Sequence, residues 1–336
     1  MLTDHFCTKI YKNTNLEYVY AQFKSDDLGL ITRKFDKVVL ACGALQTTAL
    51  LKRSHELLQS NISDLLGNFL MEHREGYIGI ISSYKKDKKR LFKKLSLNNE
   101  NKAILEFNGI GVAIANSNEI SGNAINIHYE IRNIMPRFYF RRLAKQSYTE
   151  NKLVKIFLLD LLATVEKYFL YILRNLRKLY DLARRIERYS IYIKAEELAN
   201  KDSRAYLANN SDILAYDHKV SSQTYTLIIN DIEVFKNTFK QKFSAKIRLY
   251  KGVTNITSVH KFFGPNWHSM GTTRFGTSSE KSICDENLEI YGAKNCFVLS
   301  SSIFPSGSNS NPTFTTLALA SRLSESEKFN SQIDRF

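Results

Sequence analysis

The sequence predicts a mixed fold, α+β or α/β, with one doubly wound parallel sheet and a second region of antiparallel strands and helices. The first observation is a nearly all-apolar run at 37–42, which Gly43 and the helical pattern of 44–54 follow. A strand, a glycine and a helix in this order form the unit of a doubly wound sheet. The second observation is a set of strand-like runs, at 76–82 and 103–127, ahead of a long helical pattern.

The elements are predicted in chain order from their apolar spacing. Residues 17–23 alternate with a period of two, which is typical of a strand. The run at 37–42 suits a parallel strand that is buried on both faces. Residues 190–207 and 223–230 are interpreted as strands, and 231–242 as a helix.

The longest helical pattern covers 151–188. Charged residues interrupt it too often for a membrane span. We expect a helix or helical pair that packs on its own domain, and a position on a membrane surface is the disfavoured alternative. Its apolar positions recur with a period of about 3.6 residues: Leu158, Leu162, Val165, Phe169, Leu173, Leu176 and Leu179.

Composition restricts the class of protein. The 336 residues are 43% hydrophobic and 24% charged, which suits an ordered protein with a sizeable core. The net charge of +15 is attributed to a lysine-rich surface, because no zinc-finger or RNP pattern supports nucleic-acid binding. The charge run at 84–94 is interpreted as a solvated loop.

The cysteines and the N-terminus bear on the compartment. None of the four cysteines forms a CxxC pair, so buried free thiols and a reducing compartment are expected, and no metal site. The first residues are polar and charged, without the apolar region of a secretory signal. A cytoplasmic location is therefore predicted.

The segment 266–325 carries the most specific chemistry. It opens with NWHSMGTTRFG, in which His268 sits in a Gly/Thr-rich loop, the kind of place where catalytic groups are found. A buried strand at 295–300 and a long polar loop follow, and then Pro312 opens an apolar helix with Asn311 as its N-cap. Such a helix start can hold a phosphate or the electron-rich ring of a reduced flavin, and the residues alone leave both open.

These pieces resemble the glucose–methanol–choline (GMC) oxidoreductases. The similar segments are HSMGTTRFG, ICDENLEIYG, the run 295–323, KVVLACGALQTTALLKRS and GNFLMEH. NKDSRAYLANNSDILAYD is similar to a segment of the sugar-oxidising branch. The resemblance covers about 38–73 and about 196 to the end.

The resemblance implies a reaction and its catalytic residues. His268 would take the hydroxyl proton of an alcohol or sugar while a hydride passes to flavin N5, and Asn311 would hydrogen-bond the same oxygen. Histidine suits this role because its ordinary pKa of about 6.5 leaves it mostly neutral near pH 7. An amide can donate to the developing alkoxide without competing for the proton.

FAD is the implied cofactor. Ser300 stands where many members carry Asp, and Phe275 where Met is usual. His73 of the MEHREG run is interpreted as a loop or packing residue. The implied contacts are Ser300 and Ser301 near the pyrophosphate and ribityl chain, Asn311, Pro312 and Thr313 along the isoalloxazine, and Ala41 and Gly43 at the adenosine half.

The GxGxxG turn of FAD enzymes is not found, and the nearest pattern, Gly109-Ile-Gly111, lacks the third glycine. An incomplete FAD-binding doubly wound sheet is therefore predicted, with 1–75 as its remnant, 76–255 as a substrate-binding domain with a helical insertion at about 151–188, and 256–336 returning to the FAD domain. The alternatives are a truncated non-catalytic remnant, or half of a split enzyme whose partner polypeptide supplies the N-terminal FAD domain. The other expected partner is a small alcohol or sugar substrate. A nucleic-acid partner is not expected.

Overall fold

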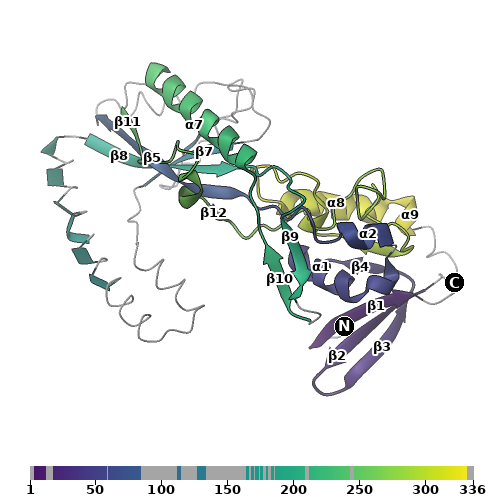
Figure 1. The fold of residues 1–336 in the computed structure, drawn as a ribbon. Coiled ribbons are helices and arrows are strands. Elements are labelled where there is room, and N and C mark those ends of the chain that lie inside the picture. Colours follow the sequence, from purple (N-terminus) through teal and green to yellow (C-terminus); the bar gives the residue numbers. More distant parts are fainter. Residues whose placement is uncertain are drawn as a thin grey trace.

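The protein is described by a computed structural model, shown in Figure 1. Two groups of elements, each with its own apolar core, make up most of the described part. The domain bounds given above stay a prediction. The described residues are 4–12, 18–58, 60–84, 112–114, 127–133, 186–208, 212–242 and 246–330, with 164–165, 168–169, 171–173, 175–176, 179–180 and 183–184.

The first group contains the predicted parallel strand. β4 (Val38–Leu40) pairs in parallel with β13 (Cys296–Val298), and α1 (Gly43–Arg53) follows β4, which confirms the strand–glycine–helix prediction. Leu40 and Val298 enter the same core as Leu51 of α1. The group also holds the antiparallel sheet of β1 (His5–Lys12), β2 (Val19–Ser25) and β3 (Gly29–Phe35), and α2 (Ser60–Leu65), α8 (Thr313–Glu325) and α9 (Glu327–Asn330).

The second group is an antiparallel sheet with a helix across it (Figure 1). α7 (Ser222–Lys242) packs Ile228, Ile232 and Phe239 against the sheet core. Tyr129 stacks on Phe235 with ring centroids 4.0 Å apart, and its hydroxyl donates to Asp231. The strand order is β11 (Lys246–Leu249), β5 (Arg74–Tyr84), β8 (Ile186–Ala195), β7 (Ile127–Asn133) and β6 (Val112–Ile114), with β12 (Gly264–Pro265) also paired to β5.

Three predicted elements differ from the structure. Residues 223–230 were expected to be a strand but belong to α7, because Ile228 and Ile232 bury one helical face that outweighs the β-branched composition. The strand expected at 190–207 is interrupted: β8 ends at Ala195, and β9 (Arg204–Leu207) pairs separately with β10 (Leu214–Asp217). The helix expected up to 188 ends before β8 begins at Ile186.

The helical prediction at 151–188 is confirmed in type between 164 and 183, where the described residues are helical, and 151–163 lies outside the described residues. The expected packing is wrong, because their apolar side chains are exposed. The helices that can be described include none long and apolar enough to cross a bilayer. The predictions for 85–94 and for Gly109–Gly111 lie outside the described residues, as does most of 103–126.

Candidate functional site

The loop that carries His268 is fixed through its backbone. The His268 N–H donates to Glu72 Oε2 at 2.8 Å, and the Ser269 hydroxyl donates to Glu72 Oε1 at 2.5 Å. Met270 and Met71 exchange two backbone hydrogen bonds of 3.0 Å. Gly271 has a φ of +88°, and a Cβ there would lie 2.3 Å from the Phe69 carbonyl oxygen. The conformation and the close approach both require glycine, so the loop is held against residues 69–72.

The imidazole of His268 is contacted by an amide that a carboxylate orients. Asn266 Nδ2 donates to Glu75 Oε1 at 2.6 Å and lies 3.3 Å from His268 Nδ1. Glu75 also accepts from the Tyr192 hydroxyl, and Lys194 Nζ lies 3.8 Å from it. Since an amide nitrogen only donates, His268 Nδ1 accepts in this contact, which leaves Nε2 to carry the ring hydrogen.

A second histidine lies against the first. The rings of His73 and His268 are 5.4 Å apart at 72°. His73 is fully buried, and its Nδ1 lies 2.9 Å from the Ser308 carbonyl oxygen, so Nδ1 carries the hydrogen. Its Nε2 is buried without a hydrogen-bond partner in the described structure. Burial lowers the pKa of His73, which keeps the ring neutral.

The serines predicted to contact FAD belong to the same network. Ser300 is buried, and its hydroxyl lies 2.5 Å from that of Ser302, which accepts from Thr273 Oγ1 at 2.6 Å. Ser301 Oγ donates to the Ser269 carbonyl at 2.8 Å. The Ser300 hydroxyl is therefore already occupied inside the protein, and these serines tie the 300–303 segment to the His268 loop.

The start of α8 differs by one residue from the prediction. Pro312 is the N-cap, Thr313 is the first helical residue, and no side chain caps the helix. Asn311 was expected to be the N-cap; Pro312 holds that place with a helical φ of −74° and ψ of −14°. Asn311 and Thr313 are exposed and Pro312 is buried. The Asn311 amide is therefore open to a ligand, and no contact recorded for the described residues joins it to His268.

The turn that holds Ala41 and Gly43 meets the same loop. Gly43 has a φ of +73° and begins α1, while Ala41 is exposed. Thr272 Oγ1 donates to the Ala44 carbonyl at 3.2 Å. The structure thus joins the β4–α1 turn and the 300–303 segment to the His268 loop. The loop before Asn311 contacts His73 through the Ser308 carbonyl.

Sequence reasoning missed the residues that position His268. Glu72, Glu75 and Asn266 were given no role, and His73 was interpreted as a loop or packing residue. The available signals were the position of Glu72 and His73 at the end of the GNFLMEH run and that of Asn266 at the start of NWHSMGTTRFG.

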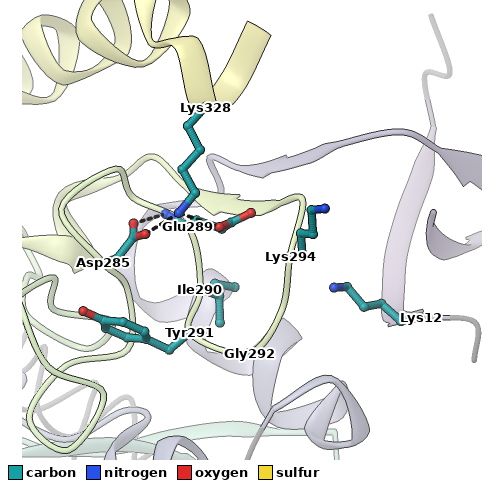
Figure 2. Close-up of a pocket in the computed structure, with 8 residues that line it drawn as sticks. All are labelled: Lys12, Asp285, Glu289, Ile290, Tyr291, Gly292, Lys294 and Lys328. Carbon is teal, nitrogen blue, oxygen red and sulfur yellow. Dashed lines mark hydrogen bonds and ion pairs between the residues drawn. The ribbon is translucent and has the colours of Figure 1, made fainter. Parts of the chain in front are cut away.

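A separate cavity of about 260 Å³ lies away from this network, and Figure 2 shows its lining. Lys328 Nζ bridges Asp285 at 2.5 Å and Glu289 at 2.7 Å. None of the predicted site residues lines this cavity, which is formed by Lys12, Asp285, Glu289, Ile290, Tyr291, Gly292, Lys294 and Lys328.

The fold is that of several solved oxidases. Pyridoxine 4-oxidase from Mesorbium loti is 14% identical with a TM-score of 0.54, over 99% of this chain and 57% of that one. Formate oxidase from Aspergillus oryzae is 9% identical with a TM-score of 0.58, over 98% and 60%. An FAD-dependent oxidoreductase from Chaetomium thermophilum gives 13% and 0.54, over 96% and 60%.

Residues 174–320 match the family model described as GMC oxidoreductase, so this part of the chain is similar to the C-terminal part of that family. C-glycoside 3-oxidase of Microbacterium trichothecenolyticum is 29% identical over 132 residues, which are 38% of this chain and 24% of that protein. 2-Methyl-1,2-propanediol dehydrogenase of Mycolicibacterium austroafricanum is 33% identical over 108 residues, 32% and 19% respectively. The chain spans about three-fifths of the solved structures' length.

Proposed function

We propose that this chain is the catalytic part of an FAD-dependent oxidoreductase that acts on the CH–OH group of an alcohol or sugar. The observation that carries the proposal is the position of His268. Its backbone is held by Glu72, its ring is contacted by Asn266, and a neutral buried histidine lies beside it. This loop lies within the segment that matches the GMC oxidoreductase family.

The residues present fit one half of FAD better than the other. The exposed Asn311 and Thr313 at the uncapped start of α8 suit the isoalloxazine, because unpaired N–H groups there favour an electron-rich ring. Ala41 and Gly43 are accessible for the adenosine half. The Ser300 hydroxyl is hydrogen-bonded to Ser302, so the pyrophosphate would be bound by Ser301 and backbone groups instead.

Bound FAD would supply the hydride acceptor, and the protein side chains would handle the proton. His268 takes the hydroxyl proton of the substrate, and Asn311 donates a hydrogen bond to the same oxygen. The Asn266 contact is long, at 3.3 Å, so releasing it to free the ring nitrogen costs about 0.5–1.5 kcal/mol. The carboxylate of Glu75, which holds Asn266, places a negative charge near the resulting imidazolium, and neutral His73 adds no opposing charge.

We further propose that an FAD-binding polypeptide segment covers the outer face of α8. Phe314 and Leu317 of this helix are 83% and 63% exposed, and Val39 of β4 is 37% exposed. A parallel strand pair is normally covered on both faces. A nucleotide-binding strand–turn–helix unit would bury these side chains and provide the missing phosphate contacts.

Trp267 offers a direct test because it is the single tryptophan of the chain, is 78% exposed and precedes His268. FAD is titrated into the protein, with and without a polypeptide that carries a GxGxxG segment. Binding at the proposed site quenches Trp267 emission by energy transfer to the flavin. Alcohols and sugars are then added without oxygen, and the loss of visible flavin absorbance is followed. Absence of both signals in both preparations contradicts the proposal.

A further inference from the structure

The helical residues between 164 and 183 expose an unusual amount of apolar surface. Their large apolar side chains are between 44% and 65% exposed, and none belongs to either core. An exposed patch formed by this many large apolar side chains usually marks an interaction site. The exposed residues are Val165, Tyr168, Phe169, Tyr171, Ile172, Leu173, Leu176, Leu179 and Tyr180.

Most of these apolar residues keep to one side of the helix, whereas Tyr171 and Leu173 fall outside it. Val165, Phe169, Ile172, Leu176 and Leu179 recur at spacings of three and four, which places them along one stripe. The tyrosines at 168 and 180 border this stripe at the helical spacing of 100° per residue. The sequence from 164 to 185 holds six basic residues against two acidic ones, and Arg184, the described one among the basic residues, falls outside the stripe.

The helix lies at the far end of the molecule from the proposed flavin site. In Figure 1 its teal segments descend from the left end of the six-stranded sheet, whereas α8 and α1 lie at the right. A segment that covers the outer face of α8 would therefore leave these residues uncovered. The next element along the chain, β8, begins at Ile186 and supplies Tyr192 and Lys194 to Glu75.

We propose that this helix binds an anionic phospholipid surface and lies in the plane of the membrane interface. An apolar stripe with aromatic residues and a Lys/Arg-rich opposite side is what such a surface recognises. Positive charge on the helix complements acidic headgroups, and tyrosine rings suit the interface, where one end of the ring is apolar and the other wet. No described helix can cross the bilayer, so the contact is peripheral.

Vesicle flotation tests this proposal without any flavin. The purified protein is mixed with phosphatidylcholine vesicles that contain or lack phosphatidylserine, at low and high salt. Binding is expected with the anionic vesicles at low salt and is expected to weaken as salt screens the charges. Equal binding to both vesicle types, or none to either, overturns the proposal.

Matched variants distinguish vesicle binding through the stripe from unspecific binding through exposed apolar side chains. Phe169→Asp with Leu176→Asp is expected to weaken vesicle binding more than about tenfold, because each lost apolar side chain is worth at least that factor. Arg184→Glu is expected to weaken it by about fivefold or more. Leu28→Asp replaces an equally exposed leucine, 64% accessible, at the β2–β3 turn and should leave binding unchanged.

Two outcomes with these variants overturn the proposal. An equal loss with Leu28→Asp shows that the binding is unspecific. Concentration-dependent self-association without lipid, abolished by Phe169→Asp with Leu176→Asp, shows that the stripe is a protein interface. All these side chains are exposed, so circular dichroism should report unchanged folding. Lipid binding and flavin reduction are measured separately, so either can fail alone.

Discussion

Glu72 provides the sharpest test of how His268 is held. The carboxylate is 5% exposed and accepts from the His268 N–H at 2.8 Å and from the Ser269 hydroxyl at 2.5 Å. Glu72→Ala leaves the His268 N–H without its acceptor. Glu72→Gln keeps the shape, because its amide oxygen can accept from His268 while its amide nitrogen donates to Ser269.

The magnitude follows from these two contacts. A hydrogen bond to a charged group is worth about 1.5–3 kcal/mol, so two would give at most about 3–6 kcal/mol. Replacing Glu72 by alanine also removes the desolvation penalty of a buried carboxylate, which offsets part of this cost. We expect Glu72→Ala to lower the free energy of unfolding by about 2–4 kcal/mol, and Glu72→Gln by about 1 kcal/mol or less.

Urea unfolding followed by circular dichroism measures both values. Glu233→Ala is the matched control, because its partner Lys236 lies on the half-exposed side of α7. It should change stability by no more than about 0.5 kcal/mol. A Glu72→Ala protein within about 0.5 kcal/mol of the wild type refutes the idea that this carboxylate anchors the His268 loop.

The remaining predictions concern pH, backbone and thiols. Burial lowers the pKa of His73, so below about pH 6.5 the unfolded chain binds a proton that the folded protein does not, and stability declines as the pH falls. His73→Asn should therefore flatten the decline of the urea midpoint from pH 7 to 5. An unchanged slope in this variant contradicts a role of His73 in the acid sensitivity. Gly271→Ala should cost about 2–4 kcal/mol, whereas Gly264→Ala, where a Cβ meets nothing within 4 Å, should cost much less; equal costs contradict the close approach to Phe69. Exposed Cys42 should react quickly with a thiol reagent and be protected by FAD, while buried Cys284 and Cys296, the latter with its pKa raised to about 12, should react only on unfolding.

The predictions from sequence succeeded where the pattern is local. The run at 37–42 predicts a parallel strand buried on both faces because it contains no alternation; β4 confirms the parallel strand, but Val39 is 37% exposed, so one face is open in this structure. The α7 prediction was wrong because 223–230 is rich in β-branched residues, and only the full helix reveals the spacing of Ile228, Ile232 and Phe239. The parallel pairing of β4 with β13 joins distant parts of the chain and leaves no local signal.

In the candidate site, too, residues within a local motif were predicted, whereas residues that only the fold brings together were not. A motif carries His268, and the helix start near Asn311 was predicted to within one residue. The groups that orient His268 come from the start of β5 and the residues before it, so only the fold brings Glu72, His73 and Glu75 to the loop. The expectation of buried thiols failed at Cys42, because the β4–α1 turn is open.

The most direct test of the central claim is the rate of flavin reduction without oxygen. The FAD-loaded protein is mixed with an excess of an alcohol or sugar that it oxidises, and the wild type is compared with His268→Ala. A proton acceptor at His268 predicts a loss of about 10²–10⁴-fold with flavin still bound, and Trp267 quenching verifies the binding. An unchanged reduction rate in His268→Ala would show that His268 does not take the substrate proton.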